Sequence, residues 1–107
     1  MKILRGIPAS PGKISGKAVV VKSSKDFKKV KKGMILVTTA TTPAFTPILS
    51  KVIGIVTDYG GVCSHAAMIS REFGIPCVVG TEKATKKIKD FMKITVDGSK
   101  GVVEYDE

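Results

Sequence analysis

Residues 58–80 read Asp58-Tyr-Gly-Gly-Val-Cys-Ser-His-Ala-Ala-Met-Ile-Ser-Arg-Glu-Phe-Gly-Ile-Pro-Cys-Val-Val-Gly80 and contain the chain's only histidine, His65. Ser64 is a favourable N-cap residue, and Gly74 is a stop signal at the expected distance. Between them, apolar residues recur at helical spacing, at Ala66, Ile69 and Phe73. The pattern predicts a short helix over residues 64–73 with His65 at its start.

The segment before this helix predicts an anion site. Gly60 and Gly61 allow the backbone a close approach or a positive φ. The first N–H groups of a helix have no intrahelical partner and lie at the positive end of its dipole, which suits phosphate. We therefore expect a phosphate at His65 to be supported by the neighbouring residues Gly60, Gly61, Cys63, Ser64 and Ala66. The same dipole disfavours a cation, so a neutral imidazole with a free lone pair is expected to act as nucleophile.

The rest of the chain alternates strand and helix patterns. Apolar, β-branched runs predict strands at 17–23, 34–38, 52–57, 77–79, 93–97 and 102–105, the last two forming a hairpin. A threonine followed by a proline predicts a helix over residues 43–49, and a basic helix is expected within 81–89. Residues 24–32 form one helical turn or a loop, and residues 7–16, with two prolines and two glycines, an ordered loop. This order defines an α/β fold.

Length and composition fit one soluble domain. The 107 residues are 43 % hydrophobic, which predicts a single globular domain over 1–107. No apolar run approaches the roughly 20 residues of a membrane span, and the N-terminus lacks the apolar core of a signal peptide. We therefore expect a cytoplasmic protein with no membrane association. The two cysteines, Cys63 and Cys77, fit a reducing compartment, although a disulfide between them stays possible.

The formal net charge of +9 comes mostly from lysine. A loose run comprises Lys22, Lys25, Lys28, Lys29, Lys31 and Lys32. Nucleic-acid binding is one reading of this charge, but the run has no interleaved aromatic residues for stacking. A solvated surface, an acidic partner protein or a phosphorylated ligand accounts for the charge at least as well.

Other chemistries lack their motifs. Cys63, His65 and Cys77 could supply three metal ligands, but no C-x-x-C pair is present, so we expect no metal site. The glycine-rich nucleotide-binding motifs G-x-x-x-x-G-K-[ST] and G-x-G-x-x-G do not occur, so no nucleotide site is expected in this chain. Cys77 lies in an apolar strand pattern and is expected in the core.

The run Gly60-Gly-x-x-Ser-His-Ala-Ala-Met-Ile-Ser-Arg71 resembles the phosphohistidine signature of enzymes that use phosphoenolpyruvate (PEP). Pyruvate phosphate dikinase, PEP synthase and enzyme I of the sugar phosphotransferase system are members. The likeness to their mobile domain extends from about Gly6 to Tyr105, through segments 6–12, 15–21, 33–37, 41–43 and 74–80. The combination of segments is specific to that family.

This resemblance implies a swivelling β/β/α domain with His65 as the phosphoryl carrier, through Nε2. In the family the domain swings between a PEP/pyruvate site on a TIM barrel and a second site, for ATP or a carrier protein. Arg71 falls on the signature's basic position and is expected to orient the loop or the phosphate. The alternative reading of Arg71 is a cation favoured at a helix C-terminus.

Two segments depart from the family pattern. Cys63 stands where the family usually has Thr, which removes a hydroxyl that could bond the imidazole or the phosphate. Residues 90–93, Asp-Phe-Met-Lys, replace a usual Gly-Asp turn, with an effect expected only on a surface loop.

The functional hypothesis is therefore a free-standing carrier domain, one component of a PEP-utilising phosphotransferase rather than a complete enzyme. It would bind no cofactor itself. Mg²⁺ with nucleotide or PEP is expected on a PEP-binding or nucleotide-binding partner protein. A second hypothesis is a non-catalytic docking or regulatory module of the same fold, which the Cys63 departure favours. Nucleic-acid binding ranks third.

Overall fold

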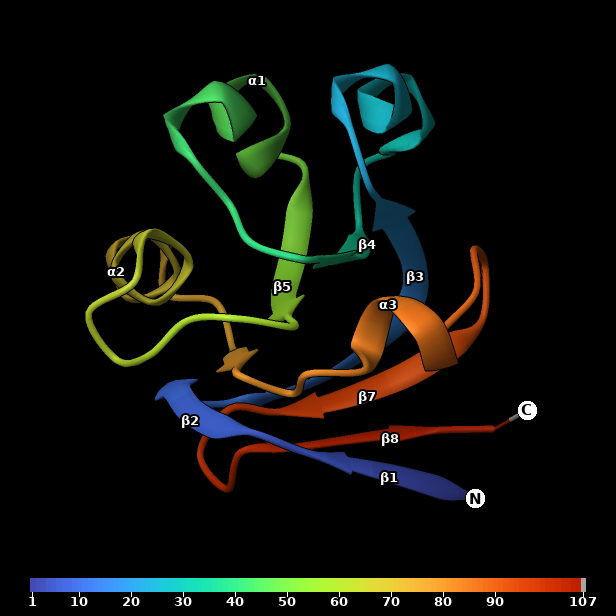
Figure 1. The fold of residues 1–107 in the computed structure, drawn as a ribbon, viewed down its shortest axis with the longest axis vertical. Coiled ribbons are helices and arrows are strands. Elements are labelled where there is room, and N and C mark those ends of the chain that lie inside the picture. Colours follow the sequence, from blue (N-terminus) through green and yellow to red (C-terminus); the bar gives the residue numbers. More distant parts are fainter. Residues whose placement is uncertain (107) are drawn as a thin grey trace.

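The computed structural model describes residues 1–106 as eight strands in one mixed sheet with short helices (Figure 1). None of the helices in that range combines the length and hydrophobicity of a membrane-spanning segment. In chain order the elements are β1 Lys2–Arg5, β2 Ile7–Ser10, β3 Lys13–Val21, η1 Ser24–Lys29, β4 Met34–Thr38, η2 Pro43–Phe45, α1 Thr46–Leu49, β5 Val52–Thr57, α2 His65–Phe73, β6 Cys77–Val79, α3 Ala84–Lys87, β7 Lys93–Asp97 and β8 Val102–Tyr105. The elements labelled η are 3₁₀-helices.

The strand order is β1-β8-β7-β3-β4-β5-β6-β2. The central strands β3, β4, β5 and β6 are parallel, whereas the outer pairs are antiparallel. β1 and β2 lie at opposite ends of this order, yet only Gly6 separates them in the chain. The sheet therefore curls until its two edges meet, and the Gly6 amide donates to the Gly101 carbonyl at 2.9 Å.

Curling produces two apolar layers. β3 side chains alternate between them, since Val19 and Val21 belong to one cluster and Ala18 and Val20 to the other. The first cluster lies between the parallel strands and α1, α2 and η1. The second lies between the parallel strands and the antiparallel strands β7, β8 and β1, beneath α3. The layers are thus sheet, sheet and helix, and the predicted β/β/α class is confirmed.

Most predicted elements are present. The strands predicted at 34–38, 52–57, 77–79, 93–97 and 102–105 have those bounds, and the last two form the expected antiparallel hairpin. Thr42 caps η2 by accepting from the Ala44 amide at 3.2 Å, as the Thr-Pro signal predicted. Residues 24–29 form one short 3₁₀-helix.

The prediction for residues 7–16 was wrong. They form β2 and the first part of β3, not a loop, and β1 was not predicted at all. β2 is an edge strand, where the missing N–H of Pro8 leaves no gap inside a ladder. Pro11 and Gly12 make the corner between the two strands.

The helix expected within 81–89 is reduced to α3, residues Ala84–Lys87. Glu82 has φ 69°, which a right-handed helix excludes. Its amide donates to the carbonyl of Asp58, and that of Thr81 donates to the carbonyl of Thr57, the last residue of β5. These bonds hold residues 81–82 against the loop after β5 and delay the start of the helix.

Candidate functional site

α2 presents His65 at its first residue. The Ser64 N-cap is extended, with φ −67° and ψ 160°, and its Oγ accepts from the Ala67 amide at 3.3 Å. Gly74 ends the helix in the left-handed region, at φ 70°. The helix therefore begins and ends as predicted, and the amides of His65 and Ala66 have no carbonyl of their own helix to bond.

The loop between β5 and α2 is folded tightly against the serine cap. Gly60 has φ 126°, and a Cβ there would lie 3.0 Å from the Ser64 Cβ. The Gly61 carbonyl accepts from the Ser64 amide at 3.0 Å. The buried Asp58 carboxylate accepts from the amide and hydroxyl of Thr85, which ties the loop to α3. Gly60, Gly61 and Ser64 thus converge at the start of α2.

The imidazole of His65 is half-buried and contacts Thr41. Thr41 Oγ1 lies 2.8 Å from His65 Nδ1, and Thr41 is only 7 % exposed. When Nδ1 carries the proton it donates to Thr41, and the lone pair is then at Nε2. The threonine therefore orients the ring by contacting Nδ1, whichever of the two atoms donates.

Thr41 was not among the predicted site residues. It follows β4, and β4 and β5 are parallel neighbours, so the loops after both strands leave the same edge of the sheet. Backbone bonds join the two loops, from the amides of Asp58 and Tyr59 to the carbonyls of Thr38 and Thr39, at 3.1 and 3.0 Å. The parallel pairing of two consecutive predicted strands was the signal that could have placed Thr41 beside the histidine.

The Arg71 guanidinium joins two distant segments. Nη1 donates to the Ala9 carbonyl of β2 at 2.8 Å, and Nη2 donates to the Val62 carbonyl of the site loop at 2.9 Å. Arg71 is also in the last turn of α2, where a cation is favourable. The contact with Val62 suits the role of holding the loop, whereas a role in binding phosphate stays a prediction.

The two cysteines have different environments, and both are free thiols. Cys63 is exposed, one residue before the cap. Cys77 is buried in β6, and burial raises the pKa of its thiol to about 11. No group of three His, Cys, Asp or Glu side chains able to hold a metal occurs within residues 1–106.

Several apolar side chains are exposed near the site. Tyr59 and Val62 of the loop are 62 % and 54 % exposed, and Met68 of α2 is 52 % exposed. Ala66, by contrast, is buried, so only its backbone amide could contact an anion. Exposed aromatic and methionine side chains are enriched at protein interfaces, so this face suits contact with another protein surface.

Comparison with known proteins identifies the family of the chain. Residues 30–101 match the family model described as PEP-utilising enzyme, mobile domain. The chain is 54 % identical over 101 residues to a probable phosphoenolpyruvate synthase of Archaeoglobus fulgidus, covering 94 % of this chain and 13 % of that protein. It is equally identical to the phosphoenolpyruvate synthase of Pyrococcus furiosus, of which it covers 12 %.

A solution structure of Enzyme I is also similar, with a TM-score of 0.65 and 30 % identity. The match covers 75 % of this chain and 33 % of that one. The fold and these matches define a swivelling α/β domain similar to that of Enzyme I. The chain belongs to the family of mobile domains of PEP-utilising enzymes. It spans about an eighth of the length of the curated relatives it matches.

Proposed function

We propose that the domain is a phosphoryl carrier that is phosphorylated at Nε2 of His65. It would move the phosphoryl group between a PEP/pyruvate site and a nucleotide or carrier-protein site on partner domains or chains. The observation that carries the proposal is the 2.8 Å contact between Thr41 Oγ1 and His65 Nδ1. That contact orients a half-buried ring at the first residue of a helix and leaves the other nitrogen free.

In the transfer step the Nε2 lone pair attacks the phosphorus of the donor. The N–P bond forms as the donor's P–O bond breaks, and the donor oxygen leaves with the electron pair; from PEP this gives the enolate of pyruvate, which is then protonated. Nδ1 keeps its proton and donates it in a hydrogen bond to Thr41 Oγ1. The phosphorylated ring therefore carries positive charge beside the phosphoryl group. The reverse attack by an acceptor oxygen restores the free imidazole.

The surrounding groups support an anion at this point. The amides at the start of α2 have no intrahelical partners, and the helix dipole favours negative charge there. Phosphoryl transfer depends mostly on position and electrostatics, and each aligned hydrogen bond to a charged group contributes about 1.5–3 kcal/mol. Mg²⁺ with nucleotide or PEP would be held by the partner.

The docking or regulatory module remains the second candidate because Cys63 replaces the family's usual Thr. The geometry makes the replacement at position 63 a weaker argument against phosphoryl transfer. Cys63 is exposed, and the hydroxyl that contacts the imidazole comes from Thr41. A hydroxyl at position 63 is therefore not needed to orient the ring.

The test is phosphorylation of the purified chain. It is incubated with PEP or with ATP, together with the Pyrococcus furiosus relative from which the matching segment has been deleted. We expect an acid-labile gain of one phosphoryl group, because His65 is the only histidine, and its loss in His65→Gln. Phosphoramidate, a small donor that needs no partner, gives a second route to the modified ring, and NMR of the ring then identifies the nitrogen. No phosphate on His65 from any of these donors would leave the docking module as the function.

A further inference from the structure

The excess positive charge is confined to two segments. Residues 17–33 and 83–93 hold twelve of the chain's eighteen Lys and Arg residues but only two of its nine acidic residues. The remainder, which includes the site loop and α2, has six basic and seven acidic residues and is nearly neutral. The basic character of the chain therefore belongs to one region and not to the surface around His65.

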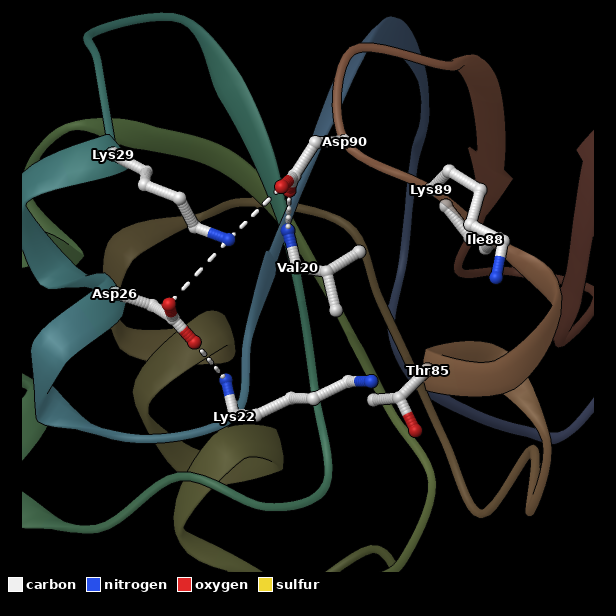
Figure 2. A pocket seen from close by; sticks show the side chains of 8 residues that line it. All are labelled: Val20, Lys22, Asp26, Lys29, Thr85, Ile88, Lys89 and Asp90. Carbon is white, nitrogen blue, oxygen red and sulfur yellow. Dashed lines mark hydrogen bonds and ion pairs between the residues drawn. The ribbon is translucent and has the colours of Figure 1, made fainter.

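These two segments lie against each other, as Figure 2 shows. Lys29 Nζ is 2.9 Å from Asp90 Oδ2 and 3.5 Å from Asp26 Oδ1. Asp90 Oδ1 also accepts from the Val20 amide at 2.7 Å. Within residues 1–106, Lys29 is the one lysine of this region that forms a salt bridge. Both acidic side chains are thus used internally, and the surrounding lysines present a largely uncompensated positive surface.

An exposed phenylalanine lies in this basic surface. Phe91 is 65 % exposed and has φ 69°, a conformation that glycine adopts freely and bulky residues rarely adopt. Its amide donates to the Ala18 carbonyl at 2.8 Å, and the Ala18 amide donates to the Met92 carbonyl at 2.9 Å. Together with the bonds of Asp90, these contacts hold a strained turn that keeps the ring in solvent.

The ring borders an open hollow of about 310 Å³. Its lining residues are Lys17, Lys31, Lys32, Gly33, Met34 and Phe91. An exposed apolar side chain that borders a hollow, with charged side chains nearby, suits a protein-binding surface. In Figure 1 the coil of residues 24–29, in cyan, and α3 lie on the side opposite α2, so a protein bound here would leave His65 accessible.

We propose that this basic surface, defined by Lys17, Lys31, Lys32 and Phe91, docks an acidic protein segment that places an apolar side chain against Phe91. Charge complementarity selects the partner: carboxylates satisfy the lysines, and an apolar residue covers the ring. A nucleic acid fits less well, because stacking proteins interleave several aromatic residues with basic ones and this region exposes one large aromatic side chain, Phe91.

The test uses a synthetic peptide with two leucines flanked by glutamates and aspartates, titrated into the isotope-labelled full chain. A second peptide has serines in place of the leucines, and a short oligothymidylate tests nucleic acid. We expect the leucine peptide to shift the amide signals of residues 31–33 and 91–93 and to leave those of α2 unchanged. Its affinity is expected to exceed that of the serine peptide and to fall in 1 M salt, where charges are screened.

Variants separate binding from folding. Phe91→Gly relieves the positive φ, so it does not unfold the turn through backbone strain. It is expected to lower the affinity for the leucine peptide roughly ten-fold. Lys31→Glu with Lys32→Glu is expected to abolish the shifts, while Lys13→Glu with Lys100→Glu, outside the basic surface, leaves them unchanged. Shifts elsewhere, no shifts, or equal affinity of the two peptides would overturn the proposal. Tighter binding of oligothymidylate, independent of Phe91, would replace it with nucleic-acid binding.

Discussion

The hydrogen bond between Thr41 and His65 holds the imidazole ring in one orientation. With Nδ1 held at 2.8 Å from a buried hydroxyl, Thr41→Val leaves a ring of unchanged shape without its partner. A single neutral hydrogen bond contributes about 0.5–1.5 kcal/mol, so we expect phosphorylation of His65 to slow roughly three- to ten-fold. The measurement is the rate of phosphoryl gain, alongside NMR of the ring nitrogens to detect a changed tautomer population.

Thr41→Ser retains the hydroxyl and is expected to keep most of the rate. Thr39→Val is the matched control, because Thr39 is exposed and bonds the site loop only through its carbonyl. If Thr41→Val and Thr39→Val transferred phosphate equally fast and with the same ring tautomer, the orienting role of Thr41 would be wrong.

The two thiols provide a separate test of burial. The raised pKa of Cys77, about 11, results from burial, so this thiol stays protonated at pH 8 and is shielded from reagents. Iodoacetamide at pH 8 is expected to label the native chain once, at Cys63, and Cys63→Ser is expected to abolish labelling. Peptide mass mapping gives the site. Labelling of native Cys77 at a rate close to that of Cys63 would contradict the packing of β6.

α2 depends on its caps because it has only nine residues. Ser64→Ala removes the bond to the Ala67 amide and is expected to cost about 1 kcal/mol of unfolding free energy. Ser64→Asp restores an acceptor and should recover most of it. Urea denaturation measures both. Ser50→Ala is the control, because Ser50 is exposed and takes part in the C-cap of α1 through its backbone N–H. A loss of stability in Ser64→Ala no larger than that in Ser50→Ala would show that the Ser64 cap contributes nothing.

Local signals in the sequence were sufficient for α2 and for β4, β5 and β6, whereas only the second half of β3 was predicted. Ser64 and Gly74 mark the helix ends by backbone preferences that act within a few residues, and buried strands such as residues 34–38 are continuous apolar runs. β1 and β2 lacked such signals, since Pro8 and Gly12 favour a loop locally. Their pairing with β8 and β6, at the far end of the chain, supplied the stabilisation that local propensity did not indicate.

The ion pairs between η1 and the turn after α3 predict a response to acid. The backbone bond from Lys22 lowers the pKa of Asp26. At Asp90 burial raises the pKa, but the bonds from Val20 and Lys29 outweigh it, so the net direction is also downward. Lowered folded-state pKa values contribute stability that is present above the unfolded value of about 3.9 and is lost as pH falls through the folded values.

We therefore expect the melting temperature to fall below about pH 4, and Asp90→Asn to make that fall shallower. Glu72→Gln, an exposed side chain on α2, serves as the control. Melting curves recorded from pH 2 to 7 test this. If the melting temperature of Asp90→Asn fell as steeply below pH 4 as that of the unaltered chain, the role of Asp90 would be refuted.

The closure of the sheet brings together residues that no short stretch of sequence relates. Gly6 lies between two strands at opposite ends of the strand order, and Thr41 reaches His65 only because β4 and β5 run parallel. The family resemblance and the helix signals located the histidine, the glycines and the serine cap. The contact of the Thr41 hydroxyl with the imidazole, and the two carbonyls that Arg71 bonds, depend on how distant segments pack together. Residue spacing alone could not predict them.

Arg71 tests whether closure of the sheet and order of the site loop are coupled. Its two guanidinium bonds, to Ala9 of β2 and Val62 of the loop, use the fork geometry that lysine lacks. Arg71→Lys keeps the charge at the end of α2 but can make only one of these bonds at a time. We expect faster amide hydrogen exchange in both β2 and residues 58–63, with slower phosphorylation of His65. Arg5→Lys, an exposed side chain on β1, is the control. If exchange rose in neither segment, or only in α2, the charge at the helix end would be the whole contribution of Arg71, and the loop would be ordered by Gly60 and Asp58 alone.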